Sequence, residues 1–185
     1  MNLANKITIF RILLIPFFIA TLLYYGEARP NLRFVALAVF ALACFTDAID
    51  GGIARSRNQI TELGVILDPI ADKLLIASAF ISLSIVKSIP QALHIPAWAV
   101  LIVLTREAII VIGSILIFFL KGNISIKPSG LGKITTFFQM TGILAILAIF
   151  QFNKFLIYPA ILFTIVSGID YIWRGSKELN EIQKA

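Results

Sequence analysis

The sequence predicts an all-α, polytopic integral membrane protein that forms a single domain over residues 1–185. Hydrophobic residues make up 59% of the chain and charged residues only 14%, whereas soluble domains carry roughly 25% charged and 45–50% apolar residues. The mean hydropathy is +0.94. The apolar residues also gather into six long segments. This composition excludes a disordered chain, a secreted disulfide scaffold and an ordinary soluble enzyme.

Each apolar segment approaches the roughly 20 residues with which a helix crosses the hydrocarbon core of a bilayer. In chain order, the six predicted transmembrane helices cover residues 10–25, 32–54, 65–86, 96–120, 131–150 and 155–173. Polar or turn-forming breaks separate them at 26–31, 55–64, 87–95, 121–130 and 151–154. A short polar segment before the first helix is expected to lie at the membrane interface, and it lacks the cleavage site of a signal peptide.

The basic residues predict the orientation. If the N-terminus is cytoplasmic, ten Lys and Arg residues fall in inside segments and four in outside segments. Because cytoplasmic loops are enriched in Lys and Arg, both termini are expected to be cytoplasmic. The net charge of +6 is therefore interpreted as a topology signal and a contact with anionic lipid. The sequence has no basic helix with interleaved aromatic residues, so we expect no nucleic-acid partner.

Four aspartates interrupt the second and third predicted helices near their cytoplasmic ends. Asp47 and Asp50 are spaced i,i+3, and Asp68 and Asp72 are spaced i,i+4, so each pair shares one helix face. An aspartate at the centre of a membrane helix costs roughly 2.5–3.5 kcal/mol, so these side chains must face a polar interior. Converging carboxylates favour a hard divalent cation, Mg²⁺ or Mn²⁺, and four of them suit two ions.

The residues around the aspartates favour a phosphate ligand, and two alternatives stay open. Gly51 allows a ligand close to the backbone, and Arg55 can pair with phosphate. In the first alternative, the acids form a salt-bridged cluster with Lys73, Arg55 and Arg106. In the second, they line the path of an ion- or proton-coupled transporter. The sequence shows neither the internal repeat nor the mid-membrane helix break that is typical of transporters.

The aspartates belong to a longer pattern, Asp47-x2-Asp50-Gly51-x2-Ala54-Arg55-x8-Gly64-x3-Asp68-x3-Asp72. This pattern resembles the complete signature of the CDP-alcohol phosphotransferase family. The resemblance extends to Asn5-x2-Thr8-x2-Arg11, to Arg106-Glu107 and to Leu131-Gly132-Lys133-x2-Thr136-x2-Gln139. It implies a homodimer of six-helix subunits, with a site that opens to the cytoplasmic leaflet.

The resemblance also implies a reaction in phospholipid biosynthesis. A phosphatidyl group passes from CDP-diacylglycerol to an alcohol, and CMP is released. The four aspartates would hold the metal ions, and Asp72 would also take the proton of the acceptor hydroxyl as general base. The cytidine and pyrophosphate would be bound by Gly51, Ala54, Arg55 and Gly64.

Two acceptor alcohols remain open, and the candidate acceptor-binding residues are Arg106, Lys127 and Lys133. The chain resembles the phosphatidylglycerophosphate synthase branch of the family, which uses sn-glycerol 3-phosphate. That branch usually has basic residues where Ser114 and Thr135 stand here. Their absence favours the cardiolipin synthase branch, whose acceptor is phosphatidylglycerol. We take glycerol 3-phosphate first because that branch is the commoner one in bacteria.

The remaining residues that attract notice are interpreted as structural. The single cysteine, Cys44, lies in an apolar run, which excludes an intrachain disulfide. His94, the only histidine, is expected on the outer side, far from the aspartates. Gly113 and Gly142 are expected to let helices pack closely. The small size and the absence of a targeting segment favour a prokaryotic plasma membrane, with the active site facing the cytoplasm.

Overall fold

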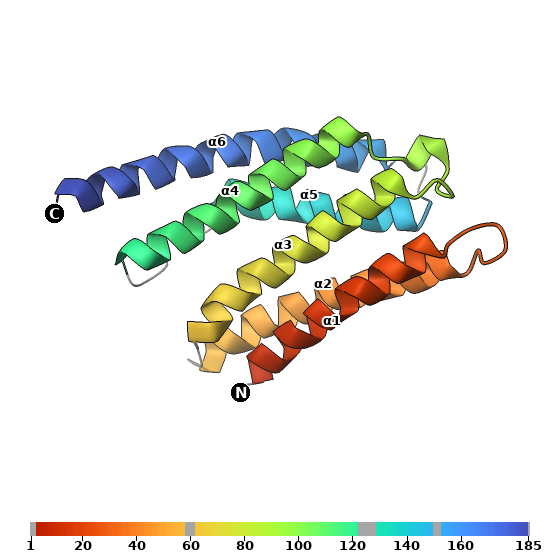
Figure 1. Ribbon diagram of the computed structural model, residues 1–185, viewed down its shortest axis with the longest axis horizontal. Helices are drawn as coiled ribbons and strands as arrows, with labels where there is room; N and C mark the ends of the chain where they lie inside the picture. Colours follow the sequence, from red (N-terminus) through yellow and green to blue (C-terminus); the bar gives the residue numbers. More distant parts are fainter. Residues whose placement is uncertain (1–2, 58–61, 122–128, 150–152, 185) are drawn as a thin grey trace.

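The computed structural model is a bundle of long helices that run back and forth along one axis (Figure 1). It describes residues 3–57, 62–121, 129–149 and 153–184, with side chains except at 3–5, 48–57, 62–69, 92, 118–119, 121 and 179–184. Within these ranges the elements are α1 (Leu3–Leu23), α2 (Leu32–Arg57), α3 (Glu62–Ile85), the 3-10 helix η1 (Gln91–Leu93), α4 (Ala97–Lys121), α5 (Gly130–Leu147) and α6 (Lys154–Lys184). Every predicted break falls between two of these helices or close to a helix end.

Four of the helices are long and apolar enough to cross a membrane. The qualifying segments are Lys6–Leu23, Ala97–Ile117, Gly130–Leu147 and Lys154–Glu178, in α1, α4, α5 and α6. This search covers only the described part of the chain, and much of the polar end of α2 and α3 lies outside it. The all-helical class is therefore confirmed for the described residues, and the four apolar helices are consistent with a membrane protein. The count of six transmembrane helices stays a prediction.

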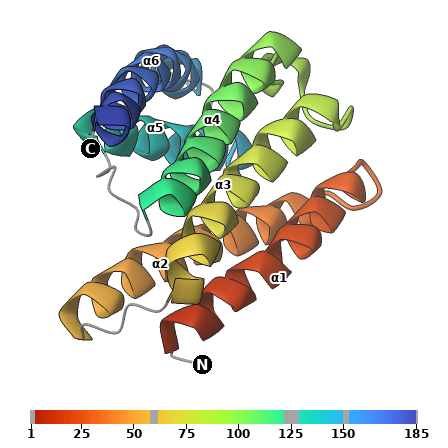
Figure 2. The same ribbon diagram turned by 60° about the vertical axis from the view of Figure 1, so that its left-hand side comes forward.

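The helices divide into two neighbouring groups. The α1 helix packs against both α2 and α3, and α6 packs against both α4 and α5. Contacts of α3 with α4 and α5, and of α2 with α5, join the groups (Figure 2). One apolar core contains buried residues of both groups, such as Phe80 of α3 and Ile157 of α6. Within the first group, Phe18 of α1 and Phe40 of α2 are fully buried with ring centroids 5.5 Å apart.

Large apolar side chains also cover the outside of the bundle. Leu13, Leu101, Ile112 and Leu162 are each more than 60% exposed. A soluble monomer rarely exposes such a surface, because it would bind other apolar surfaces in water. The outward side chains therefore agree with a bundle surrounded by lipid.

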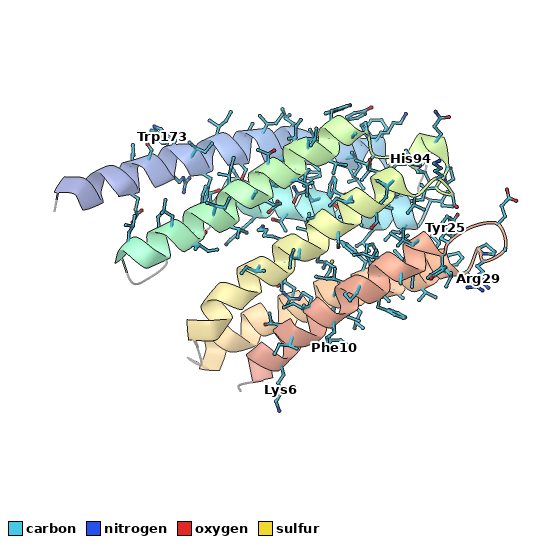
Figure 3. The ribbon with its side chains drawn as sticks, in the orientation of Figure 1. Lys6, Phe10, Tyr25, Arg29, His94 and Trp173 are labelled. Carbon is cyan, nitrogen blue, oxygen red and sulfur yellow. The ribbon has the colours of Figure 1, made fainter. Side chains whose placement is uncertain are left out.

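The two chain termini lie at the same end of the bundle, on the left in Figure 1. The connections that contain Arg29 and His94 lie at the other end (Figure 3). This arrangement follows from the alternating direction of successive long helices in the described part of the chain. It separates His94 from the end of the bundle where the chain begins and finishes.

Two glycines permit close approach of helices, as the sequence predicts. A Cβ atom on Gly113 would lie 2.9 Å from Cε1 of Tyr171, on the neighbouring helix α6. A Cβ atom on Gly142 would lie 2.7 Å from Cδ1 of Ile157, also on α6. Real Cβ contacts are longer than this, so a larger residue at Gly113 would displace the Tyr171 ring, whereas at Gly142 the end of the flexible Ile157 side chain would have to shift.

Candidate active site

A buried arginine joins two of the predicted metal ligands. Arg11 on α1 is fully buried. Its Nη1 lies 3.0 Å from Oδ1 of Asp47 on α2 and also donates to Oδ1 of Asp72 on α3. The two carboxylates are 31% and 27% exposed. Both aspartates therefore meet at one buried cation and remain partly open on their other side.

The packing of α1 explains how two distant aspartates come together. Asp47 and Asp72 lie on different helices, and α1 contacts both of these helices. The two helices that carry the aspartates are thus bridged by α1, which supplies the guanidinium. Asp47 and Asp72 are ion-paired with Arg11, whereas Lys73 and Arg106 are ion-paired with Glu107. The other residues of the salt-bridge alternative, Asp50, Asp68 and Arg55, have side chains outside the described part of the structure, so that alternative stays a prediction.

The other residues of the signature are placed only by their backbone. Asp50, Gly51, Ala54 and Arg55 lie on α2, and Gly64 and Asp68 lie on α3. Helical spacing keeps Asp50 on the face of Asp47 and Asp68 on the face of Asp72. The side chains of these residues, and the whole of Lys127, lie outside the described part of the structure. Their roles stay predictions.

The site can be tested for its fit to a divalent cation. Among the described side chains, no group of three or more His, Cys, Asp or Glu residues is close enough to hold a metal. Asp47 and Asp72 offer carboxylate oxygens, the donors that Mg²⁺ and Mn²⁺ prefer. The described donors therefore fit a hard cation, and the predicted set of four carboxylates needs Asp50 and Asp68.

A second polar cluster begins one residue after Asp72. Nζ of Lys73 lies 3.0 Å from Oε2 of Glu107 on α4, and Nη1 of Arg106 donates to Oε1 of the same carboxylate at 2.7 Å. Nη2 of Arg106 donates to Oγ of Ser167 on α6 at 2.9 Å. Arg106 and Glu107 are only 5% and 3% exposed. Glu107 is therefore ion-paired with both Arg106 and Lys73.

Arg106 lies beside the N-terminus of α5. A Cβ atom on Gly132 would be 3.4 Å from Nη2 of Arg106. Ser129 caps the helix by accepting a hydrogen bond from the Gly132 amide at 3.0 Å, and Lys133 in the first turn is exposed. A helix N-terminus carries partial positive charge and unpaired N–H groups, which attract anions. Together with Arg106 and Lys133 it suits a phosphate group.

The two positions where basic residues were expected have other bonding partners. The Ser114 hydroxyl lies 3.0 Å from the Tyr171 hydroxyl, which donates to the Ile110 carbonyl at 3.1 Å. Thr135 is fully buried, and its hydroxyl lies within 3.0 Å of the Leu131 and Phe163 carbonyls. Both side chains therefore hold helices together, and neither brings a positive charge to Arg106.

The sequence did not identify Arg11 or Ser167 as site residues. In the sequence, Arg11 stands only as a basic residue of the first span and as part of a family pattern. Its polar neighbour Thr8, three residues earlier, is also fully buried. Two polar residues on one face of an apolar helix are a usable signal for an interior polar contact. Ser167 gives no comparable signal.

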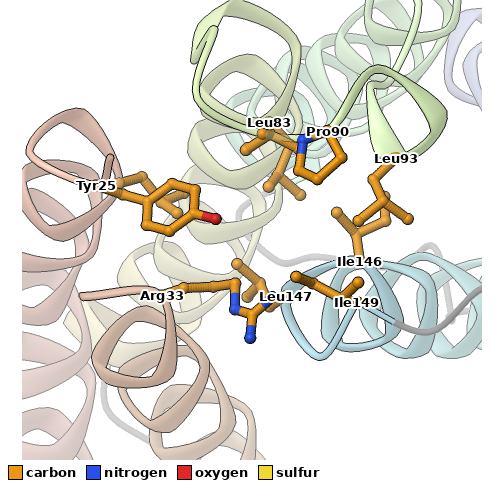
Figure 4. A pocket seen from close by; sticks show the side chains of 10 residues that line it. Tyr25, Arg33, Leu83, Pro90, Leu93, Ile146, Leu147 and Ile149 are labelled. Carbon is orange, nitrogen blue, oxygen red and sulfur yellow. The ribbon is translucent and has the colours of Figure 1, made fainter. Parts of the chain in front are cut away.

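A pocket at the far end of the bundle is separate from these clusters. It is lined by mainly apolar side chains, and Arg33 is its one charged residue (Figure 4). Nε and Nη1 of Arg33 are buried and make no hydrogen bond within the described residues, while the guanidinium lies 4.7 Å from the centroid of the Phe34 ring. The lining contains Tyr25 and Leu93, close to the connections opposite the termini. It contributes nothing to the aspartate site.

Comparison with known proteins gives the family. The family model for CDP-alcohol phosphatidyltransferase matches residues 1–166. A probable phosphatidylglycerophosphate synthase of Mycobacterium tuberculosis is 34% identical over 99% of this chain and 86% of its own length. The CDP-diacylglycerol–glycerol-3-phosphate 3-phosphatidyltransferase of Bacillus subtilis is 35% identical (97% and 99% coverage), and that of Escherichia coli K12 is 31% identical (93% and 90%).

The chain therefore belongs to the CDP-alcohol phosphatidyltransferase family. It is an enzyme, a phosphatidyltransferase of phospholipid biosynthesis. Family membership gives the class of reaction. The acceptor, the metal, the subunit arrangement and the residue roles depend on the site itself.

Proposed function

We propose that the protein transfers the phosphatidyl group of CDP-diacylglycerol to sn-glycerol 3-phosphate, forming phosphatidylglycerophosphate and CMP. The observation that carries the proposal is the meeting of Asp47 and Asp72 at Arg11, next to the Lys73–Glu107–Arg106 cluster. A carboxylate site for a diphosphate would thus begin one residue from a cationic site for a phosphate monoester. The relatives that match nearly the whole chain carry names with this acceptor.

The four aspartates would hold two Mg²⁺ or Mn²⁺ ions, which would neutralise and orient the diphosphate when bound. Arg55 would pair with the pyrophosphate, and the small residues Gly51, Ala54 and Gly64 would leave room for the cytidine nucleotide. The diacylglycerol part would remain in the bilayer beside the bundle.

Asp72 is proposed as the general base. It would take the proton of the acceptor hydroxyl while that oxygen bonds to the phosphatidyl phosphorus and the bond to the CMP oxygen breaks. Lys73, the residue after Asp72, is ion-paired with Glu107, and Glu107 is also ion-paired with Arg106. Arg106, Lys133 and Lys127 would bind the phosphate of glycerol 3-phosphate and hold its hydroxyl at Asp72.

We also propose the setting of the enzyme. Six helices would cross a bacterial plasma membrane, both termini and the aspartate site would be on the cytoplasmic side, and two chains would form a homodimer. The termini at one end of the bundle and the ten-to-four distribution of basic residues support this orientation.

A second acceptor, phosphatidylglycerol, is favoured by one observation. Ser114 and Thr135 bring no charge to Arg106, because both are bonded within helix contacts. A phosphodiester carries less negative charge than a phosphate monoester, so it needs fewer bases. With this acceptor the enzyme would form cardiolipin.

One assay separates the two acceptors. Purified enzyme with CDP-diacylglycerol and Mg²⁺ is given glycerol 3-phosphate or phosphatidylglycerol, and CMP release is measured. Release with glycerol 3-phosphate alone is the expected result. Release with phosphatidylglycerol alone would replace the proposed acceptor, and release with neither would contradict the proposed reaction.

The base assignment is tested with Asp72→Asn. We expect the variant to lose at least about 100-fold in turnover, the lower range for loss of a general base, while it remains folded. Thermal unfolding and binding of a CDP-diacylglycerol analogue in the presence of Mg²⁺ check that the site persists. Turnover close to that of the unaltered enzyme would rule out Asp72 as the base.

A further inference from the structure

Ser167 on α6 makes a hydrogen bond that joins it to the second polar cluster. Its Oγ accepts from Nη2 of Arg106 on α4 at 2.9 Å, and Ser167 is only 2% exposed. A serine or threonine inside a helix can instead donate to the carbonyl four residues earlier. Thr164, one turn earlier on α6, does so to the Ala160 carbonyl at 2.6 Å. Ser167 makes no such bond among the described residues, where its hydroxyl bonds to Arg106 alone.

The guanidinium of Arg106 is held at both of its terminal nitrogens. Glu107, the next residue on α4, accepts from Nη1 at 2.7 Å, and Ser167 accepts from Nη2. Because a guanidinium is planar and rigid, two such bonds fix the orientation of its plane. Glu107 belongs to the same helix as Arg106, so the bond to Ser167 is the one that sets the orientation of the guanidinium relative to α6.

The residue after Ser167, Gly168, leaves room for the stem of the same arginine. A Cβ atom on Gly168 would lie 3.5 Å from Cγ of Arg106. A Cβ atom on Gly132 of α5 would lie 3.4 Å from Nη2 of Arg106 and 3.8 Å from Oγ of Ser167. The α6 helix therefore contacts both the stem and the end of Arg106, and it keeps that end beside the first turn of α5. There the helix N-terminus and Lys133 supply further positive charge.

We propose that Ser167 is a positioning residue for acceptor binding, because it holds the Arg106 guanidinium toward the N-terminus of α5, where the phosphate of the acceptor binds. The proposal rests on the proposed role of Arg106, and it applies to either acceptor, since both carry a phosphate. Without the Ser167 hydroxyl, Nη2 of a buried arginine loses its partner and the guanidinium can take other orientations. The acceptor would then bind less tightly, whereas the donor nucleotide site on α2 and α3 would not change.

Ser167→Ala tests this role, and Thr164→Val is its matched control. The first substitution removes only the hydroxyl that bonds to Arg106. The second removes a hydroxyl one turn earlier on α6, which accepts from Nε2 of Gln139 on α5 at 3.0 Å and does not bond to Arg106. CMP release by each purified enzyme is measured over a range of acceptor and of CDP-diacylglycerol concentrations, with the acceptor that the unaltered enzyme uses. Thermal unfolding in detergent checks that each variant is folded.

We expect Ser167→Ala to raise the KM for the acceptor roughly tenfold, as for the loss of one hydrogen bond to a charged group. Its kcat and its KM for CDP-diacylglycerol should stay within about twofold of the unaltered values, because only acceptor binding is weakened. Ser167→Thr keeps the hydroxyl and should keep the KM low, and Thr164→Val should leave all three constants unchanged. An equal rise of the KM in Thr164→Val, or an unchanged KM in Ser167→Ala, would overturn the proposal.

A double-mutant cycle separates this proposal from the proposed function. If Ser167 acts through Arg106, Ser167→Ala should add no further rise of the acceptor KM in an Arg106→Gln background. An equal rise in that background would overturn the positioning role and leave the role of Arg106 intact. An unchanged KM in Arg106→Gln alone would contradict the role of Arg106 in acceptor binding, and the role of Ser167 with it. Without CMP release by the unaltered enzyme from either acceptor, the proposed reaction itself would fail.

Discussion

Two arginines, Arg11 and Arg106, are among the most deeply buried charges in the described part of this bundle. Arg11 on α1 is ion-paired with Asp47 on α2 and with Asp72 on α3. Arg106 is ion-paired with Glu107, the next residue on its own helix. A buried charge without a partner is strongly destabilising in a membrane protein, so these contacts constrain where the helices can lie. Arg11 also keeps two like-charged aspartates in proximity.

Arg11→Gln is expected to destabilise the protein by about 3 kcal/mol, the lower range for breaking a buried ion pair, since the carboxylates remain partly exposed. The two aspartates would then repel each other. A divalent cation could offset this repulsion, so Mg²⁺ should raise the thermal unfolding temperature of the variant more than that of the unaltered protein. Unfolding in detergent with Mg²⁺ or with a chelator measures both effects.

Arg29→Gln is the matched control for Arg11→Gln. Arg29 is exposed in the connection at the other end of the bundle. Its substitution should leave both the unfolding temperature and its response to Mg²⁺ unchanged. An Arg11 variant that behaves like the Arg29 variant would show that the bridge contributes nothing.

Glu107→Gln is expected to remove the shared partner of Lys73 and Arg106. Because the buried Arg106 and the partly buried Lys73 then lose their counter-charge, we expect a loss of about 3–5 kcal/mol in stability. The apparent KM for the acceptor should also rise, since Arg106 would lose its orientation. Detergent unfolding and steady-state assays measure the two quantities.

The i,i+4 pair of Asp170 and Arg174 provides the comparison for Glu107→Gln. Its two atoms are 2.9 Å apart, but Arg174 is 47% exposed. Solvent screening limits such pairs to about 0.3–0.5 kcal/mol, so Asp170→Asn should change stability little. A similar loss of stability in Glu107→Gln and Asp170→Asn would mean that the burial of Glu107 does not strengthen its ion pairs.

At the scale of helices, glycines and hydroxyl groups determine how α6 fits against its neighbours. The Tyr171 ring packs against Gly113. The Tyr171 hydroxyl is hydrogen-bonded to the Ser114 hydroxyl and donates to the Ile110 carbonyl. Gln139 on α5 donates to Thr164 of α6 at 3.0 Å. Membrane helices lack a hydrophobic force that drives them together, so close packing and hydrogen bonds of this kind hold them.

Gly113→Ala is expected to destabilise the protein by about 1–3 kcal/mol, the usual cost of overpacking a well-packed contact. The added methyl group would lie 2.9 Å from the rigid Tyr171 ring. Gly130→Ala is the control, because nothing lies within 4 Å of its Cβ position. Alanine stabilises helices relative to glycine, so that variant should be neutral or slightly more stable. Equal unfolding temperatures for the two variants would contradict the close contact at Gly113.

At the scale of the whole molecule, the orientation in the membrane determines which solution reaches the aspartates. Single cysteines replace Lys6, Lys177, Arg29 or Lys87 in a Cys44→Ala background, and intact cells are treated with an impermeant maleimide. All four positions are exposed. We expect labelling at 29 and 87 in intact cells, and at 6 and 177 only after permeabilisation. The reverse pattern would place the termini and the aspartate site outside.

Much of the fold follows from local sequence features. The helical class, the positions of the breaks and the close-packing glycines are all predictable, because they depend on composition, helical period and residue size. The spacing of Asp47 with Asp50 and of Asp68 with Asp72 likewise places each pair on one helix face. Whether all six helices cross the membrane is harder to predict from the sequence, because α2 and α3 combine apolar and charged residues.

The sequence by itself determined that this chain is a helical membrane protein with paired aspartates in the signature of a phosphatidyltransferase. Only the tertiary structure decided which residues pair across helices: Arg11 contacts Asp72, and in the second polar cluster Arg106 contacts Ser167, each across 61 positions of sequence. Helical periodicity fixes which residues share a face, but the rotation of one helix against another depends on side-chain packing along the whole interface. Partners that lie on different helices therefore became visible only when the helices were packed together.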